Sequence, residues 1–164
     1  MDTLPTDHRP AGAQPVKRYI TGHDGTTGES VYVDVPDLSY SPVPVPGFGT
    51  AARSYATTKL APELANDEDL KAHFSDDSVT SQKRQEIIVP STTTNPHTGE
   101  KELGGANVVN LDLEPGAVGH MHRTVSLDIS TCVMGSVYHE LDSGQKVLLQ
   151  AGVSFIPRAM FKLE

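Results

Sequence analysis

The sequence predicts an all-β fold, a sandwich or small barrel with at most one or two short helices. Short runs rich in β-branched residues alternate with turn residues, as in NVVNLDL at 107–113 and QKVLLQ at 145–150. Helical signals are sparse. Only the segment from Ala61 to Phe74 combines capping residues, early acidic residues and apolar residues one turn apart.

The other elements follow in chain order. Residues 1–15 lack apolar periodicity and are expected to form a disordered leader. VKRYI and SVYVDV, joined by a Gly-rich turn, predict a hairpin over 16–35. Closely spaced prolines from Pro36 to Gly49 predict an extended connection or edge, because proline donates no hydrogen bond to a sheet. The remaining strands are expected at 86–90, 126–141 and 153–157.

Length and charge narrow the class of protein. The 164 residues predict one domain over 16–164, within which 36–103 is an irregular, insert-like connection. Thirteen basic against 21 acidic residues give a net charge of −8, which argues against nucleic-acid or anionic-membrane partners. No apolar run exceeds three residues, and the N-terminus has no secretory h-region. With a single cysteine, Cys132, these features indicate a cytoplasmic protein without internal disulfides.

The segment from 115 to 135 carries the chemistry-bearing residues. His120 and His122 are two positions apart, so on a strand both rings point to the same face. Asp128 has the same parity and adds a carboxylate. Two histidines and a carboxylate form the facial triad of non-haem iron sites and also suit zinc or manganese. The alternative is a solvated strand pair, or a metal-free pair of histidines that exchanges protons near neutral pH.

Gly116, His120-Met-His122, Asp128 and Gly135 together resemble the first conserved motif of the cupin superfamily, with Asp128 in the place of its glutamate. The stretch PG…MHRTVSLD…GSVYHELDSGQKVLLQAG is similar to a group of small single-domain cupins of fungi and bacteria that carry an MHRT…LD motif. VKRYITGHD also resembles the start of that group. The resemblance implies a conical, jelly-roll β-barrel whose mouth holds a metal ion or an organic ligand.

The second cupin motif is degenerate. Val153 stands where an acid is expected, Ala159 replaces a glycine, and no histidine follows His139. Relative to the family, the fourth metal ligand is missing and the C-terminal wall of the barrel is expected to be incomplete. An open sheet edge exposes unpaired backbone groups and favours association, so a homodimer is expected.

Two cofactor states stay open. Either one divalent ion (Fe, Zn, Mn or Ni) is held by His120, His122 and Asp128, or the site is metal-free and the histidines act as an acid–base pair. Tyr138 shares the face of Asp128 if the strand is regular, and is expected to donate to a ligand or pack in the core. His139 then falls on the opposite face and is expected to be structural or solvated. A bulge at Gly135 would reset this register.

The catalytic residues expected are His120, His122, Asp128 and Tyr138. Because the family's relatives occur beside biosynthetic genes, the resemblance implies an enzyme that tailors a polyketide-like or other secondary metabolite in the barrel pocket. Isomerase-, cyclase-, dehydratase- or decarboxylase-type chemistry is favoured over that of an oxygenase, since the fourth ligand is missing. The alternative is a non-catalytic or degenerate cupin that binds a small ligand without turnover.

Overall fold

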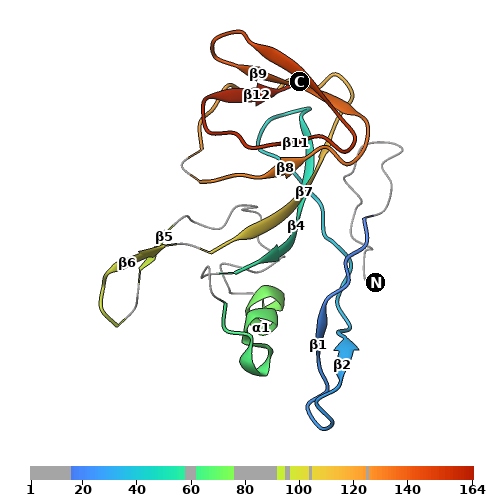
Figure 1. The fold of residues 1–164 in the computed structure, drawn as a ribbon, viewed down its shortest axis with the longest axis vertical. Helices are drawn as coiled ribbons and strands as arrows, with labels where there is room; N and C mark the ends of the chain where they lie inside the picture. Colours follow the sequence, from blue (N-terminus) through green and yellow to red (C-terminus); the bar gives the residue numbers. More distant parts are fainter. Residues whose placement is uncertain (1–15, 58–61, 76–91, 95–96, 104, 125) are drawn as a thin grey trace, which may run out of the picture. The chain divides into compact units, whose positions relative to one another are not determined.

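The computed structural model describes residues 16–57, 62–75, 92–94, 97–103, 105–124 and 126–164. The chain divides into two compact units. Unit 1 comprises Met1–Pro42 and Thr50–Asp112, and unit 2 comprises Val43–Gly49 and Leu113–Glu164. Most of the regular structure in the described residues is β-strand, with one short α-helix (Figure 1).

Unit 1 begins with the predicted hairpin, formed by β1 (Thr21–His23) and β2 (Ser30–Tyr32) in antiparallel pairing. Asp24 organises the turn, because its carboxylate accepts hydrogen bonds from the backbone N–H groups of Thr26 and Thr27 at 2.9 and 2.7 Å. These bonds lower the pKa of Asp24 below its ordinary value. A second, two-stranded ribbon pairs β5 (Thr92–Thr94) with β6 (Lys101–Leu103).

The centre of unit 1 is a three-stranded sheet in the order β3 (Ser41–Pro42), β4 (Gly49–Ala56) and β7 (Asn107–Leu113). Strand β4 is the most buried strand in the described part of the chain. Its sequence, GTAARSYA, consists mainly of small side chains, which allows both faces of a central strand to be covered. This strand lies inside the range that the sequence analysis treats as irregular.

Among the described residues there is one α-helix, α1 (Glu68–Phe74), which lies in the C-terminal part of the predicted helical segment and follows a 3-10 turn, η1 (Ala65–Asp67). The helix packs on β4, since its Asp69 accepts a hydrogen bond from Tyr55 and its fully buried His73 lies with its ring centre 5.5 Å from that of Tyr55. Leu70 is buried on the same helix.

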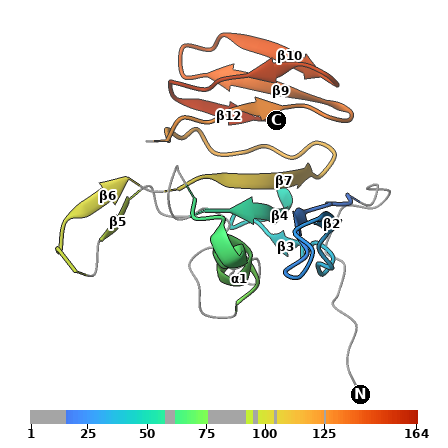
Figure 2. The same cartoon turned by 60° about the horizontal axis from the view of Figure 1, so that its bottom comes forward.

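Unit 2 contains the sheet β10–β9–β12, whose central strand is β9 (Ser136–Leu141) (Figure 2). Its neighbours are β10 (Lys146–Gln150) and β12 (Phe161–Leu163), and all pairings are antiparallel. A separate ribbon pairs β8 (Ser130–Thr131) with β11 (Ser154–Phe155). The strand expected over 126–141 is thus divided, with Gly135 at a φ of +72° between its two parts.

The all-β prediction is confirmed at the level of strand content, whereas the predicted barrel is not closed. Among the described residues, the strands form five sheets of two or three strands each. The expected leader (1–15) and the expected strand at 86–90 lie outside the described residues. The single domain expected over 16–164 stays a prediction beside the two compact units.

Candidate functional site

The segment that carries the predicted histidines runs along the free edge of β12. The N–H of Gly119 donates to the carbonyl of Leu163 at 2.8 Å, and His122 exchanges two backbone hydrogen bonds of 3.0 Å with Phe161. Gly119 permits this approach, because a Cβ there would lie 3.2 Å from the Leu163 carbonyl and 3.0 Å from the ring of Phe48. The histidine pair is therefore attached to the sheet of unit 2.

The His122 ring is held in one orientation. Its Nδ1 lies 2.8 Å from the backbone carbonyl of His120, and its ring centre lies 4.6 Å from that of Phe161. A carbonyl oxygen only accepts hydrogen bonds, so this contact requires a proton on Nδ1. In the neutral ring, Nε2 is then the basic nitrogen. The side chains of His120 and His122 are both exposed.

The sequence analysis missed His139 as a companion of His122. His139 stacks on Phe161 with ring centres 5.0 Å apart and lies 4.9 Å from Phe155 of β11. We call these four residues the histidine–phenylalanine cluster: His122, His139, Phe155 and Phe161. Within it, Phe161 is buried and contacts each of the other three rings.

His139 is partly desolvated within this cluster. Its Nε2 is shielded from solvent and makes no hydrogen bond to the described residues. Burial lowers the pKa of His139 below its usual value of 6.5, because the imidazolium form loses hydration. His139 is therefore neutral at pH 7, and its ring can take part in stacking.

The strand register reverses the expected faces of Tyr138 and His139. His139 is the direct cross-strand partner of Val147 and Leu163, on the face that also carries Phe161. Tyr138 lies on the other face, where the Nζ of Lys146 is 4.5 Å from its ring centre. Gly135, with a φ of +72°, lies between β8 and β9, at the position where the sequence analysis allows a change of register. A catalytic role for Tyr138 stays a prediction, without support from this placement.

The face of Tyr138 carries a network of opposite charges. Lys162 lies 3.4 Å from Glu140 and 3.0 Å from Glu164, and Lys146 contacts the same two carboxylates. The network connects all three strands of the sheet. This face is polar and ionic, whereas the cluster face is aromatic.

Asp128 is engaged within its own loop. Its two carboxylate oxygens accept hydrogen bonds from the hydroxyls of Thr124 at 2.9 Å and Ser126 at 2.7 Å. In the parts of the chain that the structure describes, no three His, Cys, Asp or Glu side chains are grouped so as to hold a metal ion. His120, His122 and Asp128 thus do not fit a three-ligand metal site in this arrangement, and the metal assignment stays a prediction.

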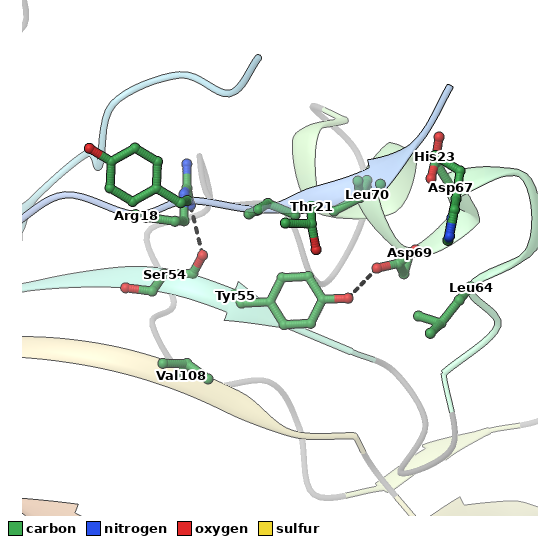
Figure 3. Close-up of a pocket in the computed structure, with 13 residues that line it drawn as sticks. Arg18, Thr21, His23, Ser54, Tyr55, Leu64, Asp67, Asp69, Leu70 and Val108 are labelled. Atoms are coloured by element: carbon green, nitrogen blue, oxygen red, sulfur yellow. Dashed lines mark hydrogen bonds between the residues drawn. The ribbon is translucent and has the colours of Figure 1, made fainter. Parts of the chain in front are cut away.

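Unit 1 contains a cavity of about 470 Å³ between the first hairpin, β4 and the turn before α1 (Figure 3). Tyr55 points into it and donates a short hydrogen bond to Asp69, and Asp67, Leu64 and Val108 also line it. Sequence reasoning found no site here. The sequence feature that could have indicated this site is the segment VKRYITGHD, which resembles the start of a cupin group. Six residues of this segment, from Arg18 to His23, line the cavity.

No helix among the described residues is long and apolar enough to cross a membrane.

Comparisons with known proteins identify distant relatives from fungi. The chain is 29% identical over 136 residues to "Phomopsin biosynthesis cluster protein C'" and 30% identical over 136 residues to "Phomopsin biosynthesis cluster protein D", both of Diaporthe leptostromiformis. Each alignment covers 82% of this chain and 62% of the relative. A third relative, the "Cupin-domain-containing oxidoreductase fogC" of Aspergillus ruber, is 26% identical over 152 residues, or 93% of this chain and 64% of that protein.

The chain thus spans less than two thirds of the length of these curated relatives. No protein-family model matches it. The cupin resemblance rests on one distant relative that bears this name, together with a β-rich fold.

Proposed function

We propose that this protein is a cupin-like tailoring protein of fungal secondary metabolism that handles a small organic molecule at the histidine–phenylalanine cluster of unit 2. The observation that carries the proposal is the convergence of His122 and His139, from two separate segments, on the buried ring of Phe161. The similarity to two biosynthesis-cluster proteins and a cupin-domain oxidoreductase supports the metabolic setting.

Proton transfer is the chemistry that this geometry favours. His122 has its Nδ1 proton directed to the His120 carbonyl, so Nε2 is free to remove a proton from a substrate carbon or hydroxyl. His120 is exposed beside His122, and neutral His139 offers an aromatic wall that favours a planar substrate. An isomerisation, cyclisation or dehydration of an enolisable aromatic metabolite fits these groups.

A metal ion would supply Lewis acidity, as the cupin resemblance implies. We derive no step through it, because both oxygens of Asp128 are engaged by Thr124 and Ser126. Oxidoreductase chemistry is a second candidate, and it is favoured by the similarity to the cupin-domain-containing oxidoreductase of Aspergillus ruber.

The homodimer is part of the proposal. Large apolar side chains in unit 2 are exposed along one segment, among them Leu127 (72%), Ile129 (73%) and Val133 (84%). Surfaces of this kind are typical of association sites. Sedimentation of the purified chain should give twice the monomer mass, and a monomer at all concentrations would refute the dimer.

The test of function uses a panel of enolisable aromatic ketones in deuterated water, followed by mass spectrometry. Proton-transfer catalysis is expected to incorporate deuterium without other change in mass, or to release water from a hydroxylated ketone. His122→Ala should reduce the rate by about 100-fold or more, since general bases contribute about 10² to 10⁴ in rate. His97→Ala, in an exposed turn, is the matched control and should retain the full rate.

The same experiment separates the candidates. Loss of two hydrogens or gain of oxygen by the substrate would support the oxidoreductase instead. A rate that is unchanged in His122→Ala would refute the site. Stoichiometric binding without any turnover would support a non-catalytic cupin.

A further inference from the structure

The Tyr55–Asp69 pair of the unit 1 cavity can accept hydrogen bonds. Tyr55 donates its hydroxyl proton to Asp69. Burial, followed by the hydrogen bond and the charge of Asp69, raises the pKa of Tyr55 far above its usual value of 10, so the hydroxyl stays protonated at neutral pH. With that proton used, the phenol oxygen and the second oxygen of Asp69 have lone pairs for an incoming donor.

The guanidinium of Arg18, which lines the cavity, is hydrogen-bonded to backbone carbonyls. Arg18 donates from its two terminal nitrogens to the carbonyls of Ser54 and Pro36, both at 2.7 Å. The lining thus holds two carboxylates, Asp67 and Asp69, against the one guanidinium of Arg18. An anionic ligand is disfavoured, and a ligand with a hydrogen-bond donor is favoured.

The backbone holds Asp67 at the cavity in an uncommon conformation. Asn66 and Asp67 have φ values of +55° and +56°, in the left-handed region that non-glycine residues rarely adopt. The Oδ1 of Asp67 faces strand β1, only 3.5 Å from where a Cβ on Gly22 would lie. Consecutive backbone strain at a pocket wall is a feature of binding sites.

The lining also has apolar side chains, some of them exposed. Leu70 is buried, while Leu64 and Val108 are 64% and 54% exposed. Tyr19 is 75% exposed. The volume of about 470 Å³ falls within the roughly 300 to 1,000 Å³ of typical small-molecule pockets. A ligand with an apolar ring would cover these side chains.

We propose that the unit 1 cavity is a second binding site, for a neutral phenol whose hydroxyl donates to Asp69 and whose ring packs on Leu64 and Val108. This inference goes beyond the proposed function, since it concerns a site in the other unit and needs no turnover. A substrate, a product or a regulatory metabolite with a phenolic ring would each satisfy this chemistry.

The test is a calorimetric titration of the full chain with two probes of the same ring system, 2-naphthol and 2-naphthoate. We expect 2-naphthol to bind at least about tenfold more tightly than the anion. Asp69→Asn should weaken 2-naphthol binding by about tenfold, because a charge-assisted hydrogen bond is lost. Glu68→Gln makes the same chemical change one residue away, outside the cavity, and should not alter the affinity.

Leu64→Gln provides a second variant that leaves the Tyr55–Asp69 hydrogen bond in place, and it should also weaken binding by severalfold. Absence of 2-naphthol binding, equal affinity for the two probes, or equal weakening in Glu68→Gln and Asp69→Asn would each overturn the proposal. Because binding is measured directly, failure here is distinguishable from failure of the rate test on His122→Ala.

Discussion

The two units present opposite kinds of chemistry. In unit 1, a phenol hydroxyl donates a hydrogen bond to a carboxylate at the wall of a cavity. In unit 2, two histidines contact one buried phenylalanine, and the Nε2 of His122 is the candidate base. The first arrangement is suited to recognition, because the hydroxyl holds its proton firmly. The second is suited to proton transfer, since imidazole is the side chain most often used as a general acid or base.

This difference matters for assigning a function. The cavity of unit 1 has a volume of about 470 Å³, typical of a small-molecule pocket. The cluster in unit 2 contains two imidazoles, and one of them, His122, lies in the segment that resembles the first cupin motif. Recognition and reaction can therefore be tested separately, by variants that affect only one of the two regions.

The largest expected effect on stability belongs to Phe161→Ala. Phe161 is 6% exposed and contacts every other ring of the cluster, so its truncation removes apolar burial and leaves a cavity. We expect a loss of about 3 kcal/mol or more in the free energy of unfolding, measured by urea denaturation.

Phe155→Ala is the control for this prediction. Phe155 is only half-buried and belongs to the two-stranded ribbon, so its truncation should cost clearly less. Equal losses for the two variants would mean that Phe161 is not the centre of the cluster.

The sequence was sufficient for much of the local structure and for part of the site. The hairpin, α1, β7 and β10 are predicted by turn residues, capping residues and alternation. Strand β4 was missed, because its small residues produce no alternating pattern when both faces are buried. Local propensity carries no information on such burial.

The residues of the histidine–phenylalanine cluster could not be derived from the alternation of side chains along the sequence. The register of β9 with its neighbours places His139, rather than Tyr138, on the face of Phe161. Pairing between His122 and Phe161, 39 positions later in the chain, depends on tertiary contacts. The spacing of His120 and His122 indicated this segment in the sequence, but no local pattern indicated that Phe161 and His139 contact it.

A smaller effect is expected for Tyr55→Phe, and it should shrink at alkaline pH. The folded-state pKa of Tyr55 is raised, so the folded protein holds this proton more tightly than the unfolded chain does. The resulting stability is present below the unfolded value of about 10 and is lost as the pH rises above it. Removing the hydroxyl should cost about 1 kcal/mol at pH 7, since the pair is only partly buried.

Thermal unfolding from pH 7 to 11 checks this prediction, with Tyr32→Phe as the matched change at a tyrosine that is 75% exposed. The wild type and Tyr32→Phe should lose stability together above about pH 10, while Tyr55→Phe loses less. If stability fell equally with pH in all three proteins, the Tyr55–Asp69 hydrogen bond would contribute nothing to the loss of stability at alkaline pH.

The smallest effect is expected in unit 2 at acid pH, from His139→Phe. Desolvation lowers the folded-state pKa of His139, so the unfolded chain binds a proton more readily than the folded protein. The stability associated with the neutral ring is present above about pH 6.5 and is lost as the pH falls through the folded-state value.

Phenylalanine retains the aromatic contacts with Phe155 and Phe161 and cannot be protonated. Unfolding of His139→Phe should therefore depend less on pH between 7 and 5 than that of the wild type, and His97→Phe in an exposed turn should retain the wild-type slope. If the pH dependence of His139→Phe equalled that of the wild type, the His139 ring would be hydrated in the folded protein. Desolvation in unit 2 would then not affect the protonation of His139.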